Sequence, residues 1–238
     1  MKKALIIFVI YNLLNFQSIK PNKINFLIRH VINSINNAES GISKLNNEIL
    51  NLEGMSGNKV RHLLNNLCSL ANGKYLEIGT WKGSTFISAL YNNEKSLKES
   101  IAIDNWSQFS GPKKEFLDNA KKYLKKDQFQ FIEKDCFNID LSQIKTKINI
   151  YFYDGDHRVE DQKQAFTYFD AIFDDVFIAI IDDYNFMNVP EGTQQAFKLL
   201  NYKIEFEKYL PSPRFTPPFD NLGWWNGIYV AVISKTNK

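Results

Sequence analysis

A glycine-containing segment with one acidic residue follows the strand-like run Lys74-Tyr75-Leu76. It reads EIGTWKGST and extends from Glu77 to Thr85. Gly79 and Gly83 would let the backbone turn tightly and approach a ligand closely. The segment lacks the GxGxxG pattern of dinucleotide-binding proteins, and the carboxylate of Glu77 would repel a pyrophosphate. It suits a ligand with an ammonium group, although a tight strand-to-helix turn without a ligand would look much the same.

Two further apolar runs end in polar residues that could contact the same ligand. Asp104 ends one run and is followed by Asn105 and Trp106. A carboxylate at this position can accept hydrogen bonds from both hydroxyls of a ribose. Asp135 and Cys136 follow the next run and could border an adenine ring. Because ligands of open α/β sheets bind at the carboxyl ends of the strands, these segments together predict one adenosine-like, positively charged ligand.

The runs that follow end in an unusual number of charged groups. The aromatic run YFY is followed by Asp154, Gly155, Asp156 and His157, and the run VFIAII is followed by two aspartates at 182–183. Asp156 is equally well explained as a cap for the helix that should begin near residue 159. The two later aspartates could also cap a turn. Convergence of three acids beside one histidine nevertheless indicates a functional site.

These segments need a sheet to bring them together. Short strand-like runs alternate with helical segments that begin near Gly83, Pro112, Val159 and Pro190, which indicates a parallel sheet covered on both faces. The continuous apolar runs IYFY and VFIAII are typical of central parallel strands. We therefore predict a Rossmann-like, seven-stranded, mostly parallel sheet with helices on both faces. The predicted strands are KYLEIG, SIAID, QFQFIE, INIYFYD, DVFIAIIDD, YKIEFEKYL and GIYVAVIS, and the helix after DGDH should bury one apolar stripe, made of Ala165, Phe166, Phe169, Ile172 and Phe173.

Residues 1–72 are predicted to form an N-terminal helical segment, a cap or an oligomerisation element, ahead of a domain at 73–238. Apolar residues recur at three and four residues from Lys23 to about Leu70. Within it, the stretch NLEGMSGNKVRHLLNNL has two glycines that bracket Met55 and Ser56. They indicate either a helix cap or a loop that folds over a ligand. The helix that follows should present one apolar face, made of Val60, Leu63, Leu64 and Leu67.

The first residues, MKKALIIFVIYNLLNF, have a basic start and an apolar run. They lack a small-residue cleavage pattern and are short for a membrane span. We expect a helix that packs on the domain or on a second subunit of a homo-oligomer. Contact with a membrane surface and secretion are the alternatives.

Composition excludes some classes of function. The formal net charge of the 238 residues is +3, with Lys and Arg spread among nearly as many Asp and Glu, so nucleic acid is not an expected partner. Cys68 and Cys136 form no metal-ligand or disulfide spacing and fit a reducing compartment. We therefore expect a cytoplasmic protein.

The strand-end motifs YLEIGTWKGST, AIDNW, EKDCFN, YFYDGDH and AIIDDYN, in this order, resemble those of class I S-adenosylmethionine-dependent methyltransferases. The resemblance covers Lys74 to about Ser234 and implies S-adenosylmethionine as cofactor. It implies that the glycine segment surrounds the amino-acid part of the cofactor, that Asp104 binds the ribose, and that Asp135 lies near the adenine. The implied cofactor-binding residues are Glu77, Gly79, Trp81, Gly83, Ser84, Thr85, Asp104, Asn105, Trp106, Asp135, Cys136 and Asp154.

Within that class, the later strand ends resemble the metal-dependent O-methyltransferases of catechol, caffeoyl-CoA, macrolide and aminocoumarin sugars. That resemblance implies Mg²⁺ or Mn²⁺ bound by Asp154, Asp182 and Asp183, in keeping with the oxygen ligands those ions prefer. The catechol and caffeoyl-CoA enzymes have a lysine base at the position of His157. A histidine has an unperturbed pKa suited to that task. The implied catalytic residues are thus His157 and Asp154, and the implied reaction is O-methylation of a small molecule such as a sugar or glycosylated metabolite.

Two other functions remain open at this stage. A metal-independent methyltransferase with another acceptor would bind the cofactor and would be indifferent to chelators. A binding or scaffold protein that retains the fold without turnover would tolerate loss of His157.

Overall fold

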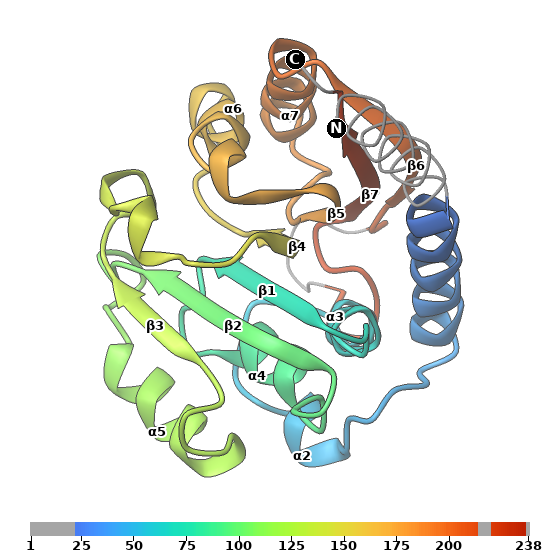
Figure 1. The fold of residues 1–238 in the computed structure, drawn as a ribbon. Helices are drawn as coiled ribbons and strands as arrows, with labels where there is room; N and C mark the ends of the chain where they lie inside the picture. Colours follow the sequence, from blue (N-terminus) through green and yellow to red (C-terminus); the bar gives the residue numbers. More distant parts are fainter. Residues whose placement is uncertain (1–21, 214–219, 237–238) are drawn as a thin grey trace, which may run out of the picture.

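A computed structural model describes residues 22–213 and 220–236 of the chain. All seven predicted strands are confirmed, and they form a single sheet in the order β3-β2-β1-β4-β5-β7-β6 (Figure 1). The strands are β1 (Gly73–Ile78), β2 (Leu97–Asp104), β3 (Gln130–Glu133), β4 (Ile148–Tyr153), β5 (Phe173–Ile181), β6 (Tyr202–Leu210) and β7 (Ile228–Lys235). The Rossmann-like fold is therefore as the alternating pattern predicts.

The sheet is parallel from β3 to β5, and β7 is inserted antiparallel between β5 and β6. The chain runs outward from β1 through β2 to β3 and then crosses back to place β4 on the other side of β1. This reversal makes the carboxyl ends of β1 and β4 the topological switch point of the sheet, the crevice at which open α/β sheets bind ligands.

Helices cover both faces of the sheet (Figure 1). One face carries α3 (Asn58–Leu67), α4 (Ser84–Leu90) and α5 (Lys113–Tyr123), and the other carries α6 (Val159–Thr167) and α7 (Asn188–Leu199). A helix over residues 22–39, α1, and the short α2 (Asn47–Leu50) precede α3. Short 3-10 turns lie at Cys136–Asn138 (η1), Leu141–Gln143 (η2) and Asp170–Ile172 (η3).

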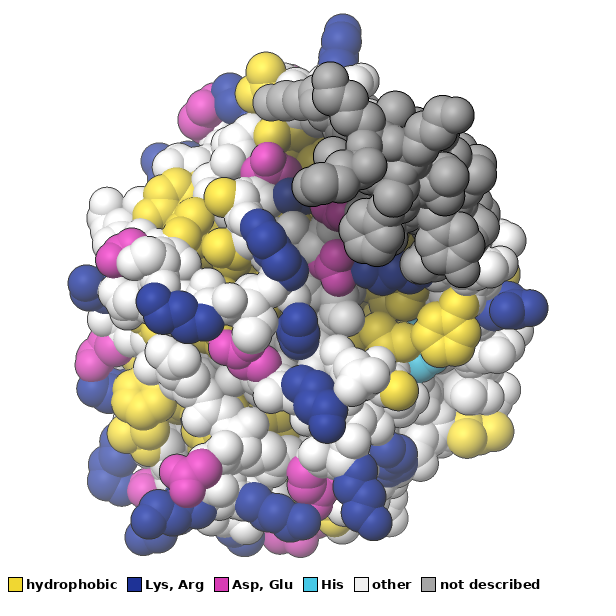
Figure 2. Space-filling view, viewed as in Figure 1, with side chains coloured by type: hydrophobic (Ala, Val, Ile, Leu, Met, Phe, Trp, Pro, Cys, Tyr) yellow, Lys and Arg dark blue, Asp and Glu magenta, His cyan; other side chains and the backbone are white. Residues whose placement is uncertain are grey.

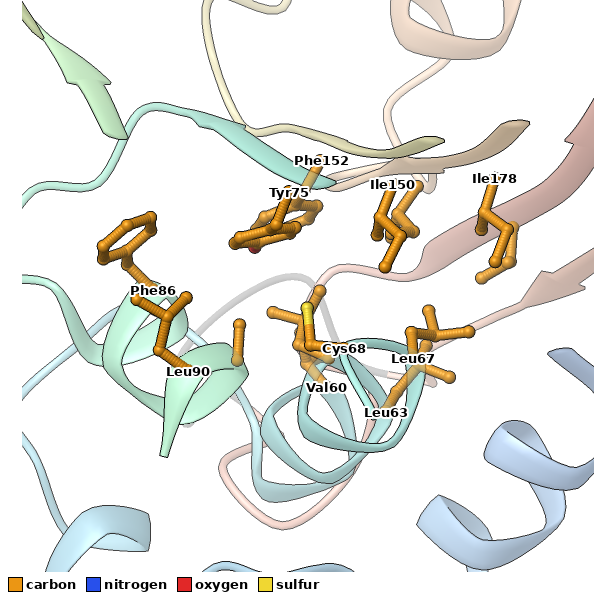
Figure 3. Packing of buried hydrophobic residues seen from close by; sticks show 14 of the residues in the cluster. Val60, Leu63, Leu67, Cys68, Tyr75, Phe86, Leu90, Ile150, Phe152 and Ile178 are labelled. Atoms are coloured by element: carbon orange, nitrogen blue, oxygen red, sulfur yellow. The ribbon is translucent and has the colours of Figure 1, made fainter. Parts of the chain in front are cut away.

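Helix α3 packs into the same core as the sheet. Its predicted apolar face is confirmed, and Figure 3 shows Val60, Leu63 and Leu67 beside the strand residues Ile150 and Ile178. The residues before the first strand therefore supply part of the core on this face. The predicted role of residues 1–16 lies outside the described residues.

The predicted apolar stripe of α6 is partly wrong. The α-helix ends at Thr167, so Phe169 lies beyond its end, Ile172 belongs to η3, and Phe173 is the first residue of β5. All these side chains are buried in one cluster with the sheet. Their burial comes from the chain turning back into the sheet, which a helical period cannot distinguish from a longer helix.

The surface and the cysteines agree with the composition. On the face shown in Figure 2, Lys and Arg side chains are interspersed with Asp and Glu. Cys68 is fully buried, and burial raises the pKa of its thiol well above the ordinary value, so it is a packing residue. Among the helices of the described residues, none is both long and apolar enough to cross a membrane.

We predict that Leu63→Ala will lower the free energy of unfolding by about 2–5 kcal/mol, because it leaves a cavity in the core that α3 shares with the sheet. Urea unfolding of the purified variant measures this. Leu199→Ala is the matched control, since the Leu199 side chain on α7 is 66% exposed, and it should change stability by about 0.5 kcal/mol or less. Equal effects of the two substitutions would show that α3 does not belong to the core.

Candidate functional site

Strands β1 and β4 continue past their paired residues into direct backbone contact. The amide of Asp154 donates a hydrogen bond of 3.0 Å to the carbonyl of Ile78. Gly79 has a φ of +82°, and a Cβ added there would lie 1.8 Å from the carbonyl oxygen of Asp154. Only glycine fits this position, both for its backbone conformation and for its contact. The glycine segment and the DGDH segment are therefore joined at the sheet crevice.

Asp104 fixes the glycine segment from the end of β2. Its Oδ2 accepts hydrogen bonds from the amides of Thr80 (2.9 Å) and Trp81 (2.8 Å), and its Oδ1 accepts one from the amide of Trp106 (2.6 Å). Trp81 and Trp106 both have positive φ angles. Since a carboxylate has about four acceptor positions, Asp104 retains little capacity for two ribose hydroxyls in this arrangement. Its visible role is to join two loops.

Glu77 is fully buried beneath the glycine segment. Its carboxylate accepts hydrogen bonds from the hydroxyl of Tyr75 and from Oγ1 of Thr85, the latter at 2.7 Å. Burial raises the pKa of Glu77 to about 8. A positive charge placed beside it would favour the ionised form and offset the cost of burial. Thr85, predicted to contact the cofactor, thus fixes the orientation of this acid.

The two tryptophans of this region have different roles. The Trp106 ring is 8% exposed and packs against Phe116 with ring centroids 5.3 Å apart, so it is a core residue. Its Nε1 donates to the carbonyl of Trp81 at 2.8 Å. The Trp81 ring is more exposed and has the ammonium of Lys82 at 4.7 Å from its centroid. Of the two rings, Trp81 is the one that remains accessible to a ligand.

The remaining predicted cofactor residues border the same crevice at its β2 and β3 side. Asn105 is exposed, and its Oδ1 accepts from the amide and hydroxyl of Ser107. Asp135 caps η1 by accepting from the amide of Phe137 at 2.9 Å. Burial, with the nearby Asp135 charge, raises the pKa of Cys136 to about 12, so it is not a reactive thiolate.

Three aspartates meet at the ends of β4 and β5. Burial, together with the charges of Asp182 and Asp183, raises the pKa of Asp154 well above its ordinary value. Burial and the charge of Asp183 do the same to Asp182, which is 3% exposed. No salt bridge within residues 22–213 and 220–236 pairs Asp154 or Asp182 with a cationic side chain. The crevice therefore carries an excess of negative charge.

Asp183 belongs to a hydrogen-bonded chain that reaches His157. Its Oδ2 lies 2.6 Å from Nε2 of His157, and its Oδ1 accepts from Nδ2 of Asn226 at 2.6 Å. The hydrogen bond with Asp183 raises the pKa of His157 above its ordinary value. The imidazole also stacks on the ring of Phe186, with centroids 5.4 Å apart and planes at 14°. His157 is thus oriented by two contacts, and its side chain remains 45% exposed.

Asn226 is the functional residue that the sequence analysis missed. It precedes β7, and backbone hydrogen bonds from Tyr184 to Gly227 and from Asn185 to Asn226 extend the β5–β7 pairing up to the site. The antiparallel register of β5 and β7 is the only signal that could have located it, and a register cannot be derived from the turn residues alone. Its amide oxygen is buried and has no hydrogen-bond partner among the described residues.

The described side chains do not form a ready metal centre. Among them, no group of three or more His, Cys, Asp or Glu residues has the arrangement of a metal site. Both oxygens of Asp183 are already hydrogen bonded, one to His157 and the other to Asn226, so neither is free to bind a metal in this arrangement.

Comparison with known proteins agrees with this architecture. Residues 76–184, from β1 to just beyond β5, match the model of a family described as a methyltransferase domain. No curated protein matches the chain.

Three solved structures show the same fold. A proposed S-adenosylmethionine-dependent methyltransferase of Streptococcus mutans is 14% identical with a TM-score of 0.53, and the match covers 74% of this chain and 48% of that one. An O-methyltransferase of Bacillus cereus in complex with SAH is 13% identical with a TM-score of 0.52, over 88% and 90% of the two chains. A proposed O-methyltransferase of Klebsiella pneumoniae is 14% identical with a TM-score of 0.52, over 88% and 95%.

Residues 76–184 thus match a methyltransferase domain, and the fold is the one found in the proposed S-adenosylmethionine-dependent methyltransferase of Streptococcus mutans named above. The predicted fold and enzyme class are confirmed.

Gly79→Ala should abolish S-adenosylmethionine binding at concentrations that saturate the wild type, because the added Cβ meets the Asp154 backbone and separates the two segments. Isothermal titration calorimetry measures the loss. Gly41→Ala is the matched control: Gly41 also has a positive φ, of +66°, but its Cβ would lie 3.9 Å from the nearest side chain. Retained binding by Gly79→Ala would mean that the crevice is not the cofactor site.

Proposed function

We propose that this protein transfers a methyl group from S-adenosylmethionine to a hydroxyl oxygen of a small molecule, with His157 as the general base. The observation that carries the proposal is the chain Asn226–Asp183–His157, which holds a partly exposed imidazole at the mouth of the sheet crevice. An imidazole oriented by a carboxylate is a recurrent arrangement of general-base catalysis.

Three observations indicate that the crevice fits this cofactor. Gly79 and Gly83 hold positive φ angles that bring the backbone close to the crevice. Glu77 is a buried acid without a cationic partner among the described residues, and the cofactor carries an ammonium group. The buried hydroxyl of Thr80 has no hydrogen-bond partner in the described part of the chain. The bound cofactor would supply an electrophilic methyl group on a sulfonium.

The protein residues would act on the acceptor. Neutral His157 would take the hydroxyl proton at Nδ1, because Nε2 faces Asp183. The Asp183 carboxylate would stabilise the imidazolium that forms. The amide oxygen of Asn226, buried and unpaired among the described residues, could accept a hydrogen bond from the same acceptor. Alignment of the hydroxyl with the methyl group would supply much of the rate acceleration.

A divalent cation, Mg²⁺ or Mn²⁺, is the second part of the proposal. Asp154, Asp182 and Asp183 offer hard oxygen ligands, and their mutual repulsion, seen in the raised pKa values of Asp154 and Asp182, is the imbalance that a cation would relieve. A cation held there would polarise the acceptor hydroxyl and lower its pKa.

A metal-independent methyltransferase is the second candidate. The hydrogen bonds of Asp183 to His157 and Asn226, and the lack of a ready metal arrangement among the described residues, favour it. In this case the His157–Asp183 pair alone would deprotonate the acceptor.

The proposed acceptor follows from the resemblance, and the proposed cellular compartment follows from the cysteines. We propose a sugar or a glycosylated metabolite as acceptor, and Phe186 and the 86% exposed Met187 would form an apolar border beside the base. Two free cysteines in the described residues support the proposal of a cytoplasmic protein.

Turnover should depend on both cofactor and metal. We predict SAH formation when the purified protein is incubated with S-adenosylmethionine, Mg²⁺ and a panel of hydroxylated acceptors, and its loss on addition of a chelator. Mass spectrometry of the reaction detects both products. Chelator-resistant turnover would establish the metal-independent candidate, and failure to bind S-adenosylmethionine would contradict the proposal as a whole.

Turnover should also depend on pH through His157. Because the base must be neutral and Asp183 raises the His157 pKa, kcat should rise with pH through a midpoint above 6.5. His157→Ala should lower kcat by roughly 10²–10⁴-fold and remove this acid limb. A pH profile unchanged by His157→Ala would exclude this residue as the base.

Asn226→Ala should lower kcat by about tenfold or more without changing S-adenosylmethionine affinity, because it frees Asp183 from one of its two partners. In a His157→Ala background the same substitution should have no further effect. The matched control is Asn93→Ala, which removes another buried asparagine, one whose side chain bonds backbone carbonyls and Lys44, and it should leave kcat unchanged. Additive effects on kcat would show that Asn226 acts independently of His157 and would contradict this prediction.

A further inference from the structure

A cavity of about 590 Å³ lies beyond the end of β6, apart from the crevice. Its walls come from the last residue of α1, the first turn of α3, and the segments that follow β6 and precede β7. None of the described residues that line it belongs to the glycine segment, to DGDH or to the chain Asn226–Asp183–His157. Small-molecule sites have volumes of roughly 300–1,000 Å³, so the cavity is large enough to hold a ligand.

Contacts between elements remote in sequence hold these walls in place. The amide of Asn58, at the start of α3, donates a hydrogen bond of 2.9 Å to the carbonyl of Asn221. Nε1 of Trp224 donates one of 3.0 Å to Oε1 of Glu39, at the end of α1. Figure 1 shows the segment before β7 running beside α3. The cavity is therefore built into the fold, as small-molecule sites usually are.

The described lining of the cavity has no net charge. It contains two acids, Glu39 and Asp220, and two lysines, Lys59 and Lys208. Glu39 forms an ion pair with Lys59, and Oδ2 of Asp220 accepts a hydrogen bond of 3.2 Å from the amide of Trp224. A charged ligand would lose hydration here without a net counter-charge to offset the cost. The lining therefore favours an uncharged ligand.

The rest of the lining is rich in apolar and cyclic side chains. Leu222 is 74% exposed and Tyr209 is 42% exposed, and Pro211 and Pro213 line the same cavity. Together they leave apolar surface open beside a cavity, where a ligand would cover it. The rigid rings of tyrosine and proline suit contact with another ring. The lining thus matches an uncharged ring with apolar faces.

The cavity lies at the same edge of the sheet as the candidate base. Because β7 is antiparallel to both β5 and β6, these two strands end at the same edge. The hydroxyl of Tyr209 donates a hydrogen bond of 2.6 Å to Oδ1 of Asn185, two residues beyond Asp183. Only β7 separates β5 from β6, so their ends lie about 10 Å apart. One sugar ring at His157 would not reach the cavity, whereas two or more joined rings would.

We propose that this cavity binds an uncharged ring at the far end of the acceptor, and that the acceptor is therefore a neutral molecule of at least two joined rings. The inference rests on the proposed function and narrows its acceptor. Leu222 and Tyr209 then determine specificity, and acceptors that carry a phosphate or coenzyme A are excluded.

The first test compares two fluorescent probes, N-phenylnaphthylamine and anilinonaphthalene sulfonate, which share one ring system and differ by a sulfonate. Fluorescence titration of the purified full chain should give at least about tenfold tighter binding of the neutral probe. Leu222→Asp should weaken the neutral probe by about tenfold or more, because it places a charge against the ring. Leu199→Asp makes the same change at a 66% exposed position of α7, outside the cavity, and should leave both affinities unchanged.

The second test connects the cavity with the acceptor. Each sugar of an acceptor panel is offered as its methyl glycoside and as its naphthyl glycoside, with S-adenosylmethionine and Mg²⁺, and SAH formation is measured. The naphthyl glycoside should have a KM at least about tenfold lower, and Leu222→Asp should remove this difference without changing the affinity for S-adenosylmethionine. N-phenylnaphthylamine should compete with the naphthyl glycoside and not with S-adenosylmethionine.

Several results would overturn the inference. Equal affinity for the two probes, or unchanged binding of the neutral probe by Leu222→Asp, would exclude the cavity as a site for an uncharged ring. Equal KM values for the paired glycosides, or a probe that binds without competing with them, would exclude the cavity as part of the acceptor site. Failure to bind S-adenosylmethionine, or to methylate any glycoside, contradicts the proposed function, whereas the probe titration still decides what the cavity binds.

Discussion

The close contact between Gly79 and the backbone of Asp154 is the constraint on which the site depends. It closes the gap between β1 and β4 where the strand order reverses, so a segment shaped for a ligand and a segment with an acid and a base become neighbours. The remaining contacts act on this junction. Asp104 fixes the glycine segment from β2, and Asn226 fixes Asp183 from the far side. Each is a hydrogen bond between elements remote in sequence, which makes the site rigid.

The site is organised by charge as much as by shape. Glu77, Asp154 and Asp182 are carboxylates whose burial raises their pKa values, at the ends of three adjacent strands. Buried acids without cationic partners destabilise a fold, so a protein that retains them has a use for the charge. The cofactor and the divalent cation that we propose would each bring positive charge to these acids.

The sheet could be predicted from the sequence because its strands are central and apolar on both faces, and their ends carry most of the site. The spacing of apolar residues predicted too long a helix after DGDH, because the residues past the end of that helix, such as Phe169 and Phe173, are also buried. Trp106 was predicted beside a ligand, yet its ring packs in the core, since adjacency to Asp104 does not fix the direction of a side chain. Asn226 could not be predicted, because its contact with Asp183 is defined by a strand register, which has no residue signature.

The position of β7 has a consequence for the order in which the candidate site is completed during synthesis on the ribosome. β7 is the last strand of the sheet in sequence, but it lies inside the sheet between β5 and β6. Asp183 must wait for a partner 43 residues further along the chain. Domains emerge from the N-terminal side during synthesis. The glycine segment is therefore synthesised well before Asn226, the residue that orients Asp183, so the two parts of the candidate site are completed at different times.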